Sequence, residues 1–515
     1  MTEEAIRKKI KSVPELCAAV GPRPRAKKVI MCHGTFDIVH PGHIRHLMYA
    51  KSKADILVAS LTADEHITKA NYRPYLPDAM RALNLAALEM VDYVVIDHKP
   101  KPLENLLVIQ PDYFAKGYEY SDGSIDPRTQ EEIDVLSRYG GEFLLTPGDV
   151  VYSSSKIIEE SPPNLASEKL TFLLDGENLD FGDLRHPFGQ FAGLKVHVIG
   201  DTIIDTHTYT TLIGGNAKTP TFSVRYGDHT DFVGGAGIVA KHLRAAGADV
   251  SLTTIMGDDA LKNFARDDLK RTGVKVNAVV DSTRPTTNKN TYIAGNYRLL
   301  KVDTLDNRTI SGRTLNDVRE HVASTAADVI ICSDFRHGIF NRETIPRLLE
   351  IMPSGALKVA DSQVASRWGN VLDFRDFDLI TPNEREARFA LGDQDSVVRP
   401  LGLHLYREAR CKLLILKLGE RGLITFRGVP RDEQDVRAFF VVDSFADRVI
   451  DAVGAGDALL AYSSMVMAIN DNPVIASVLG AMAAACECEI DGNVPIAPSD
   501  VLTKVSRFEH RANLV

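Results

Sequence analysis

Short apolar runs alternate with segments of helical spacing through most of this chain. The first run, VIMCHG, begins just after Lys28 and ends in a glycine turn. Four further apolar runs follow it, at residues 54–62, 93–97, 111–117 and 141–147. Apolar strands that alternate with helices are typical of parallel α/β sheets. The N-terminal part is therefore predicted to be a Rossmann-like α/β domain with a parallel sheet.

A second alternation of the same kind begins at Leu194 with LKVHVIGD and continues toward the C-terminus. Residues 160–192 lack a clean period, and their first part is rich in proline and serine. A chain of 515 residues is also too long for one ordinary domain. We predict domains over residues 1–160 and 193–515, joined by a linker at 161–192.

Composition narrows the class of protein. The net charge of −9 gives no broad basic surface for nucleic acid or an anionic membrane. Six cysteines are scattered over a long chain, which argues against a disulfide framework. No apolar run approaches membrane-spanning length, and the charged N-terminal residues do not resemble a signal peptide. We expect a cytoplasmic enzyme that binds neither nucleic acid nor membrane.

The first candidate site is the segment GTFDIVHPGH, residues 34–43. A strand ends at Gly34 and a helix opens near Pro41, where proline suits the first turn. Backbone N–H groups at a helix start favour an anion. His40 and His43 are three residues apart, so one helical turn can place both on one side. The segment predicts a site for a triphosphate, whereas Asp37 is equally at home as a turn or cap residue.

This segment resembles the HxGH nucleotidyltransferase superfamily, within its cytidylyltransferase-like group. The likeness continues through ADEHITK at 63–69, Arg73-Pro74, Arg81, KGYEY at 116–120 and SSSKII at 153–158. It implies that a phosphate oxygen attacks the α-phosphorus of a nucleoside triphosphate and releases pyrophosphate. The implied nucleotide-binding or catalytic residues are Gly34, Thr35, Phe36, His40, His43, Lys69, Arg73, Lys116, Ser153, Ser154 and Ser155. The stretch GDVV at 148–151 lacks the arginine of the glycerol-phosphate branch, so a sugar phosphate is the favoured acceptor.

The second candidate site is DAVGAGD, residues 451–457, at the start of an apolar helical segment. Gly454 and Gly456 let the backbone approach a phosphate closely. Asp457 would stand beside those N–H donors, where a carboxylate can take the proton of an attacking hydroxyl. The segment predicts phosphoryl transfer to an alcohol.

The same segment resembles the signature of the ribokinase-like, or PfkB, carbohydrate kinases. Further blocks agree, at Gly200-Asp201, Gly234-Gly235-Ala236, MGDD at 256–259, TPNE at 381–384 and KLG at 417–419. The likeness implies an α/β domain with a small β-lid, which often pairs two subunits. It implies sugar binding by Asp201, Asp205, Gly234, Gly235, Lys289 and Asp303, Mg²⁺ binding through Glu386, and ATP binding by Asn383, Glu386, Lys417, Gly419, Gly454, Ala455 and Gly456.

Within that family, three blocks resemble the heptose kinase half of the ADP-heptose synthases: PTTNK at 285–289, KVD at 301–303 and SDFRHG at 333–338. Those enzymes also carry an HxGH transferase, although their kinase comes first. The chain departs from the family pattern at Ile238, at residues 214–220 and at 289–291, positions that meet the sugar. Because a lost polar contact changes which hydroxyls can be satisfied, the identity of the sugar stays open.

These patterns together predict a bifunctional enzyme of NDP-sugar biosynthesis. It would use ATP and Mg²⁺ to phosphorylate a sugar or a sugar phosphate similar to heptose 7-phosphate. It would then transfer a nucleotidyl group, from ATP in preference to CTP, to a sugar 1-phosphate. Two alternatives remain: a CTP-dependent transferase joined to a polyol or pentose kinase, and a protein with one half reduced to a binding or dimerisation module. A homodimer is implied by the resemblance alone.

Overall fold

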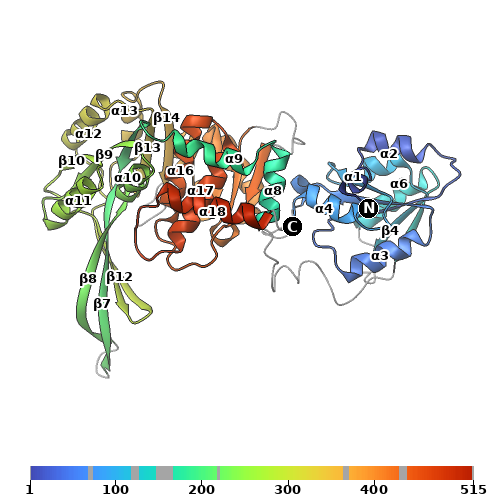
Figure 1. The fold of residues 1–515 in the computed structure, drawn as a ribbon, viewed down its shortest axis with the longest axis horizontal. Coiled ribbons are helices and arrows are strands. Elements are labelled where there is room, and N and C mark those ends of the chain that lie inside the picture. The colour runs from blue at the N-terminus through green and yellow to red at the C-terminus, as the bar shows by residue number, and fades with distance from the viewer. Residues whose placement is uncertain are drawn as a thin grey trace. The chain divides into compact units, whose positions relative to one another are not determined.

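The computed structural model describes residues 2–67, 74–117, 127–146, 166–216, 221–363, 370–428 and 438–512. The chain divides into two compact units, with the boundary between residues 165 and 166. Figure 1 shows both units as layered α/β structures. We describe each unit by itself.

A five-stranded parallel sheet forms the N-terminal unit, in the order β3-β2-β1-β4-β5. The order reverses between β1 and β4, the place where open α/β sheets bind ligands beyond their carboxyl ends. The predicted Rossmann-like parallel sheet is confirmed. Its strands are β1 (Val29–Gly34), β2 (Ile56–Thr62), β3 (Tyr93–Asp97), β4 (Tyr113–Gly117) and β5 (Glu142–Thr146).

Helices cover both faces of this sheet, which explains why its strands are apolar runs rather than alternating ones. Leu47 of α3 and Leu85 of α4 belong to one buried cluster, and Leu16 of α2 and Leu106 of α5 belong to the other. The helices are α1 (Glu3–Arg7), α2 (Val13–Val20), α3 (Pro41–Lys51), the 3₁₀ turn η1 (Asp64–His66), α4 (Asp78–Ala86), α5 (Leu103–Ile109) and α6 (Pro127–Ser137).

The C-terminal unit is built on a nine-stranded sheet in the order β10-β9-β6-β13-β14-β15-β16-β17-β18. The strands from β10 to β16 run parallel, and β17 and β18 continue the sheet antiparallel. They are β6 (Lys195–Gly200), β9 (Asp249–Met256), β10 (Lys275–Val280), β13 (Val329–Asp334), β14 (Leu357–Ser362), β15 (Leu379–Ile380), β16 (Leu413–Lys417), β17 (Leu423–Phe426) and β18 (Phe439–Val442).

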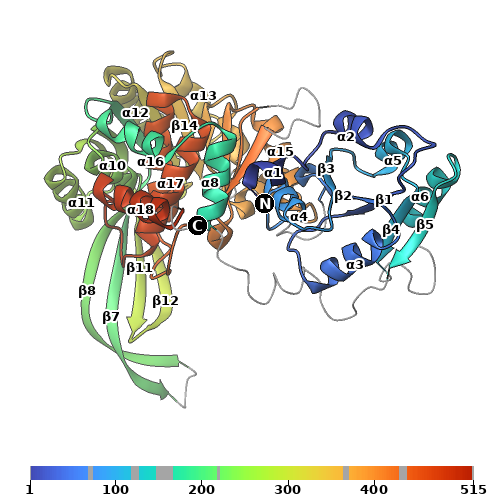
Figure 2. The same ribbon diagram turned by 45° about the vertical axis from the view of Figure 1, so that its right-hand side comes forward.

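A second sheet of four strands forms the lid of this unit, in the order β12-β11-β7-β8. Figures 1 and 2 show β7 and β8 extending well away from the layered body. The lid strands are β7 (Thr202–Asn216), β8 (Thr221–Gly235), β11 (Asn288–Ala294) and β12 (Tyr297–Thr304). The predicted α/β domain with a β-lid is therefore confirmed.

Two buried clusters hold the helices of this unit against the two faces of the large sheet. Neighbouring residues of one strand enter different clusters, as Ile330 and Ile331 of β13 do. The helices are α10 (Ala236–Ala245), α11 (Ala260–Arg271), α12 (Gly312–Ser324), α13 (Thr344–Leu349), α14 (Glu384–Leu391), α15 (Val398–Ala409), α16 (Ala455–Asn470), α17 (Pro473–Cys488) and α18 (Pro498–Ala512), with 3₁₀ turns η4 (Val371–Phe374) and η5 (Gly419–Arg421).

The interval that we predicted as a linker contains packed structure. Residues 166–192 form α8 (Ala166–Gly176), α9 (Phe181–Arg185) and the turn η3 (His186–Gly189). Their side chains Leu170, Leu174 and Phe191 are buried in the core of the C-terminal unit. The short helices carry only one or two inward apolar residues per turn, which leaves little periodicity to detect in the sequence. Residues 161–165 lie outside the described part of the chain.

Across the described residues, no helix is both long enough and apolar enough to cross a membrane.

Candidate functional site

The predicted histidine pair lies at the start of α3, directly beyond the carboxyl end of β1. His40 is the N-cap of the helix, and its Nδ1 accepts a hydrogen bond of 3.1 Å from the backbone N–H of Gly42. The rings of His40 and His43 are stacked, with centroids 3.9 Å apart. Burial lowers the pKa of His40, which favours the neutral ring. A neutral ring that accepts at Nδ1 carries its proton on Nε2, where it can serve as a donor.

The turn between β1 and α3 is held by buried polar contacts. Phe36 has a positive φ of 48° and is almost fully buried, with its ring 5.2 Å from that of His43. Asp37 is also buried, and its two oxygens accept hydrogen bonds of 2.8 Å from the N–H groups of Tyr75 and Leu76. Asp37 therefore ties the turn to a neighbouring loop. The turn reading of this residue is the one the structure supports.

Arg81 of α4 is a supporting residue to which the sequence analysis gave no role. Its side chain is fully buried, and its guanidinium donates to the carbonyl oxygens of Thr35 at 2.5 Å and Thr62 at 2.9 Å. It also contacts Asp64 at 2.6 Å. One cation thus joins the loops that follow β1 and β2. Its sequence signals were a lone arginine within an apolar segment and its place among the blocks that resemble the HxGH family.

Lys116 lies at the end of β4, which pairs with β1 on the side opposite to β2. Its ammonium pairs with Glu132 of α6 at 2.5 Å. Thr146 at the end of β5 donates to the Lys116 carbonyl and contacts Nδ1 of His46 at 2.6 Å. Burial lowers the pKa of His46 to about 4, so this second histidine within α3 is neutral near pH 7.

The structure thus brings Gly34, Thr35, Phe36, His40, His43 and Lys116 to the carboxyl edge of one sheet. Five other residues of the predicted site lie outside the described residues: Lys69, Arg73, Ser153, Ser154 and Ser155.

In the C-terminal unit, Asp457 stands in the first turn of α16. Gly454 is the N-cap, with a positive φ of 87° that favours glycine, and Ala455 and Gly456 open the helix. The Asp457 side chain is buried, and its Oδ1 has no hydrogen-bond partner among the described residues. Burial, reinforced by Asp361 and opposed by Lys417, raises the pKa of Asp457 to about 8. The arrangement is that of a carboxylate poised to accept a proton.

Lys417 at the end of β16 is the cation of this site. Its Nζ lies 2.8 Å from Oδ1 of Asp361 at the end of β14. A Cβ on Gly456 would lie 3.2 Å from the same Nζ, so the ammonium lies close to the start of α16. Burial disfavours the charge on Lys417, but Asp361 and Glu386 raise its pKa. The resemblance had placed Lys417 with the nucleotide, whereas its direct partner here is a carboxylate.

Asn383 and Glu386 form the start of α14 and lie beside Lys417. Oε1 of Glu386 accepts from the Asn383 side chain and Oε2 from its backbone N–H, both at 2.7 Å. Burial, with Asp361 adding to the effect and Lys417 opposing it, raises the pKa of Glu386. No group of three or more His, Cys, Asp or Glu residues in the described ranges is placed to hold a metal directly. This set fits a Mg²⁺ ion that keeps its waters and binds one carboxylate together with phosphates.

Several residues that the sequence predicted to bind a sugar lie in or beside the lid strands. Asp205 of β7 accepts a hydrogen bond of 2.8 Å from the side chain of Asn493. A Cβ on Gly234 would lie 2.2 Å from Oδ2 of Asp205, so only glycine leaves this carboxylate in place. Gly235 has a positive φ of 58° and ends β8. Burial raises the pKa of Asp205, and the nearby Lys289 opposes that rise.

The contacts of Asp201 and Asp303 connect these two residues less directly to a sugar site. Oδ2 of Asp201 accepts from the N–H groups of Phe335 at 3.0 Å and His337 at 3.2 Å, so this carboxylate anchors a loop. Burial raises the pKa of Asp201 to about 6. Asp303 is exposed on β12, opposite Lys289 of β11. Gly419 lies at the start of η5 with a positive φ of 63°.

Two acidic residues near the turn that precedes α16 were missed by the sequence analysis. Asp361 lies one residue before the end of a buried strand, which was a usable signal. Glu487 lies inside the apolar helix α17, and burial raises its pKa to about 8. A Cβ on Gly454 would lie 2.8 Å from Oε1 of Glu487, which places this carboxyl directly behind the turn.

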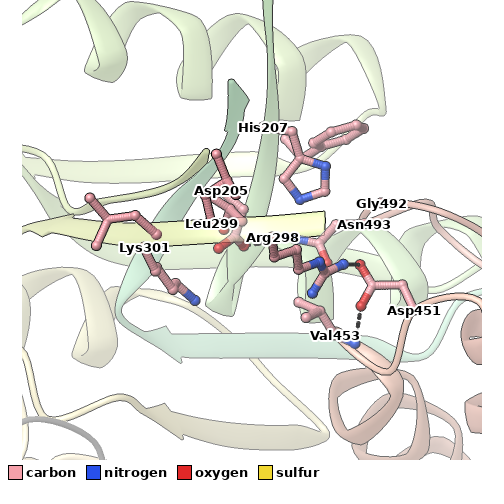
Figure 3. Close-up of a pocket in the computed structure, with 12 residues that line it drawn as sticks. Asp205, His207, Arg298, Leu299, Lys301, Asp451, Val453, Gly492 and Asn493 are labelled. Atoms are coloured by element: carbon pink, nitrogen blue, oxygen red, sulfur yellow. Dashed lines mark hydrogen bonds and ion pairs between the residues drawn. The ribbon is translucent and has the colours of Figure 1, made fainter. Parts of the chain in front are cut away.

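A cavity of about 300 Å³ opens between the lid and the segment before α16. Figure 3 shows Asp205, His207 and Arg298 of the lid facing Asp451 and Asn493 of the body. Its lining mixes carboxylates, cations and an amide, which suits a polyhydroxylated ligand more than an apolar one. The lining residues are Asp205, His207, Phe232, Thr291, Arg298, Leu299, Leu300, Lys301, Asp451, Val453, Gly492 and Asn493.

Ile238, one of the positions where this chain departs from the family pattern, is buried. Ile238 belongs to α10 and has no exposed surface. The polar residue of the family is thus replaced by an apolar side chain inside the fold, not by another group exposed to the cavity.

Solved structures share the fold of this protein. Phosphofructokinase-2 from Escherichia coli, solved in complex with substrates and products, is similar with a TM-score of 0.51. The likeness covers 62% of this chain and 100% of that one at 15% sequence identity. The tetrameric inhibited form of the same enzyme gives a TM-score of 0.50 and 15% identity over 61% of this chain and 99% of that one. At this level of identity the likeness shows the fold alone.

Curated relatives carry the name bifunctional protein HldE. That from Helicobacter hepaticus is 27% identical over 53% of this chain and 56% of its own length. That from Pelobacter propionicus is 27% identical over 64% of this chain and 66% of its own length. A relative from Campylobacter jejuni subsp. jejuni reaches 37% identity, over 30% of this chain and 31% of its own. The chain thus matches less than two thirds of the length of these relatives.

Sequence profiles of two families match the chain in the two units described above. The cytidylyltransferase-like profile matches residues 31–160. The profile of the pfkB family carbohydrate kinases matches residues 194–487, more than half of the chain. The protein therefore belongs to the pfkB family of carbohydrate kinases and carries an N-terminal cytidylyltransferase-like domain.

Proposed function

We propose that this protein is a bifunctional enzyme of NDP-sugar biosynthesis. Its C-terminal unit phosphorylates a sugar or sugar phosphate with ATP. Its N-terminal unit transfers a nucleotidyl group from a nucleoside triphosphate to a sugar 1-phosphate and releases pyrophosphate. The observation that carries the kinase half is the buried carboxylate of Asp457 in the first turn of α16, beside Gly454 and Gly456.

In the kinase step, a sugar hydroxyl attacks the γ-phosphorus of ATP. The new O–P bond forms as the bond from phosphorus to the ADP oxygen breaks, and the hydroxyl proton passes to Asp457. The N–H groups at the start of α16 stabilise the transferred phosphoryl group. The ammonium of Lys417 lies 2.8 Å from Asp361, so it offsets the negative charge of the carboxylates that lie near the transferred phosphoryl group.

Bound Mg²⁺ would neutralise phosphate charge in this step, with Glu386 and Asn383 organising the ion or its waters. Asp205, Gly234 and Asn493 orient the acceptor sugar, together with Lys289 and Asp201. Their contacts beneath the lid support this role. Asp303 and Gly419 complete the proposed binding set, for the sugar and the nucleotide respectively.

In the transferase step, a phosphate oxygen of the sugar 1-phosphate attacks the α-phosphorus, and pyrophosphate leaves. No covalent enzyme intermediate is needed, because positioning and charge neutralisation suffice. His40 and His43 would donate to the triphosphate from the start of α3, with Gly34, Thr35 and Phe36 shaping the turn. Lys116, Lys69, Arg73 and the serines at 153–155 would add cations and donors.

The favoured acceptor for the kinase is similar to heptose 7-phosphate, and ATP is the favoured nucleotide for the transferase. The HldE relatives and the resemblance of residues 285–289, 301–303 and 333–338 support this choice. The missing arginine at 148–151 speaks against the polyol branch. The competing proposal is a CTP-dependent transferase joined to a polyol or pentose kinase.

A homodimer formed through the lid is the proposed assembly. Phe222 and Ile213 on β8 and β7 are 76% and 69% exposed, and Leu212 and Tyr226 lie on the same two strands. Large apolar side chains gathered on one extended sheet are typical of an interface. Sedimentation of the wild type as a monomer at micromolar concentration would contradict this assembly.

The cytoplasm is the proposed location. All six cysteines are free in the structure, and four of them are buried. Reduced thiols of this kind suit a reducing compartment.

Product analysis by mass spectrometry tests the whole proposal. Purified protein, Mg²⁺ and a panel of sugars and sugar phosphates would be offered ATP and CTP in turn. We expect a phosphorylated sugar from the kinase, and an ADP-sugar when a sugar 1-phosphate is supplied. CDP-linked products would favour the alternative, and an inactive half would be the binding module of the second alternative.

A further inference from the structure

One ion pair joins the lid to the segment that precedes the phosphate-binding turn. Nη2 of Arg298, near the start of β12, lies 2.8 Å from Oδ2 of Asp451. Figure 3 shows the Arg298 side chain reaching across the cavity mouth to Asp451. The Arg298 side chain is half exposed, whereas that of Asp451 is only 5% exposed. The carboxylate is therefore the buried partner of the pair, and the lid arginine is the partner that solvent can reach.

Asp451 also shapes the turn itself. Its Oδ1 accepts a hydrogen bond of 3.1 Å from the N–H of Val453, the residue before the N-cap Gly454. The N–H groups of Ile450 and Asp451 donate to the carbonyl of Cys488 at 2.8 and 3.2 Å. One oxygen of the carboxylate thus holds the turn that leads into α16, and the other reaches the lid. The side chain of Asp451 therefore contacts both the lid and the turn.

We propose that Arg298 is a positioning residue that latches the lid to Asp451 and so couples lid closure to the ordering of the anion-binding turn at 451–456. This role rests on the proposed kinase function of the same site. Arg298 lines the cavity beside Asp205 and Asn493, so closure over a sugar and engagement of Asp451 occur at one place. The direct partner of Arg298 is Asp451, so its role is to position that carboxylate and not to take part in the chemistry.

The strength of the contact suits a latch that opens in every catalytic cycle. An ion pair with one half-exposed partner contributes little stability and is weakened by salt. A small free-energy change is still enough to shift a two-state lid several-fold. With the lid closed, water is kept from the γ-phosphate; with the lid open, water competes with the sugar hydroxyl. Loss of the latch should therefore raise ATP hydrolysis relative to sugar phosphorylation.

Hydrogen exchange of the full-length protein tests the coupling without relying on activity. In Arg298→Gln we expect amide exchange at residues 297–300 and 451–453 to quicken on the order of 3- to 10-fold. The matched control is Arg225→Gln, which removes an exposed arginine from β8 of the same lid. Arg298→Lys keeps the charge and should restore most of the protection. Unchanged exchange at 451–453 in Arg298→Gln would overturn the proposal.

Kinetics supply the second readout. Arg298→Gln should lower kcat for sugar phosphorylation roughly 5-fold and raise the ratio of ATP hydrolysis to phosphorylation by a similar factor, with KM for ATP little changed. Asp451→Asn keeps an acceptor for Val453 but loses the charge, and adding Arg298→Gln to it should have little further effect. Additive effects of the two changes would overturn the latch. A wild type that phosphorylates no acceptor would refute the kinase proposal instead, while the exchange experiment still decides the latch.

Discussion

The ammonium of Lys417 lies 2.8 Å from Asp361, and a Cβ on Gly456 would lie 3.2 Å from the same ammonium, so one cation lies beside both a buried carboxylate and the start of α16. Asp361 lies one residue before the end of β14 and Lys417 ends β16, and only the short β15 separates these strands in the sheet. The parallel sheet therefore builds the charge balance of the kinase site.

Replacing Lys417 with methionine should destabilise the C-terminal unit and stop the kinase. It leaves Asp361 without its cation, and breaking one side of a buried pair costs about 3–5 kcal/mol. Denaturant unfolding of the variant measures this cost. Lys412→Met is the matched control, because Lys412 is 78% exposed in its pair with Asp378 and should cost no more than about 1 kcal/mol. An equal loss of unfolding free energy in the two variants would show that Lys417 does not balance the charge of Asp361.

Asp457→Asn should abolish sugar phosphorylation and leave nucleotidyl transfer unchanged, because the amide cannot take the hydroxyl proton. Separate assays of the two half-reactions on one preparation measure this. Retained kinase turnover in the variant would refute the role of Asp457 as the base.

The same variant should also be more stable than the wild type above pH 8. The pKa of Asp457 is raised to about 8, so the folded state binds a proton that the unfolded state releases near pH 4. Wild-type stability is therefore lost as the pH rises from about 4 to 8, and asparagine removes that loss. We expect a gain in Tm on the order of 5 °C at pH 9 and a much smaller gain at pH 5. A gain independent of pH would contradict the pKa argument.

Kinase activity should rise with pH through the same range. The base form of Asp457 is the ionised form, so kcat/KM for the sugar should fall about tenfold per pH unit below about pH 8. Measurement of kcat/KM between pH 6 and 9.5 in the wild type checks this. A kcat/KM that stays constant down to pH 6 would show that the pKa of Asp457 in the free enzyme lies well below 8.

Gly234→Ala should weaken sugar use without unfolding the protein. The added methyl group would stand 2.2 Å from Oδ2 of Asp205 and 2.8 Å from Nδ2 of Asn493, so the carboxylate must move. A displaced acceptor should cost about 10- to 100-fold in kcat/KM for the sugar. Gly312→Ala is the control, since a Cβ there meets nothing within 4 Å. Equal kinetics for the two variants would exclude Asp205 from the sugar site.

Asp37→Asn should reduce nucleotidyl transfer while the kinase keeps its rate. The buried carboxylate accepts from two backbone N–H groups, and an amide retains only one acceptor oxygen. Losing one such bond costs about 1–3 kcal/mol, which loosens the turn that carries His40. Glu104→Gln, on an exposed side chain of α5, should change neither activity. Wild-type transfer in Asp37→Asn would contradict the tie between the two loops.

Much of the fold could be predicted because the periodicity of apolar residues is local. Buried parallel strands appear as apolar runs, and glycine or proline marks where helices begin. The helices of residues 166–192 were not predicted because each places few side chains in the core, such as Leu170 and Leu174. Their place is set by packing against α18 and α17, far away in sequence.

The two helix starts at His40 and Gly454 could be predicted from the sequence, because each is marked by residues that lie within a few positions of one another. Which groups face those helix starts depends on how the chain folds in three dimensions. Asp361 meets Lys417 across 56 positions, Asn493 meets Asp205 across 288, and Arg298 meets Asp451 across 153. A local pattern cannot encode such contacts, since they depend on the order of strands in the sheet and on where the lid folds back.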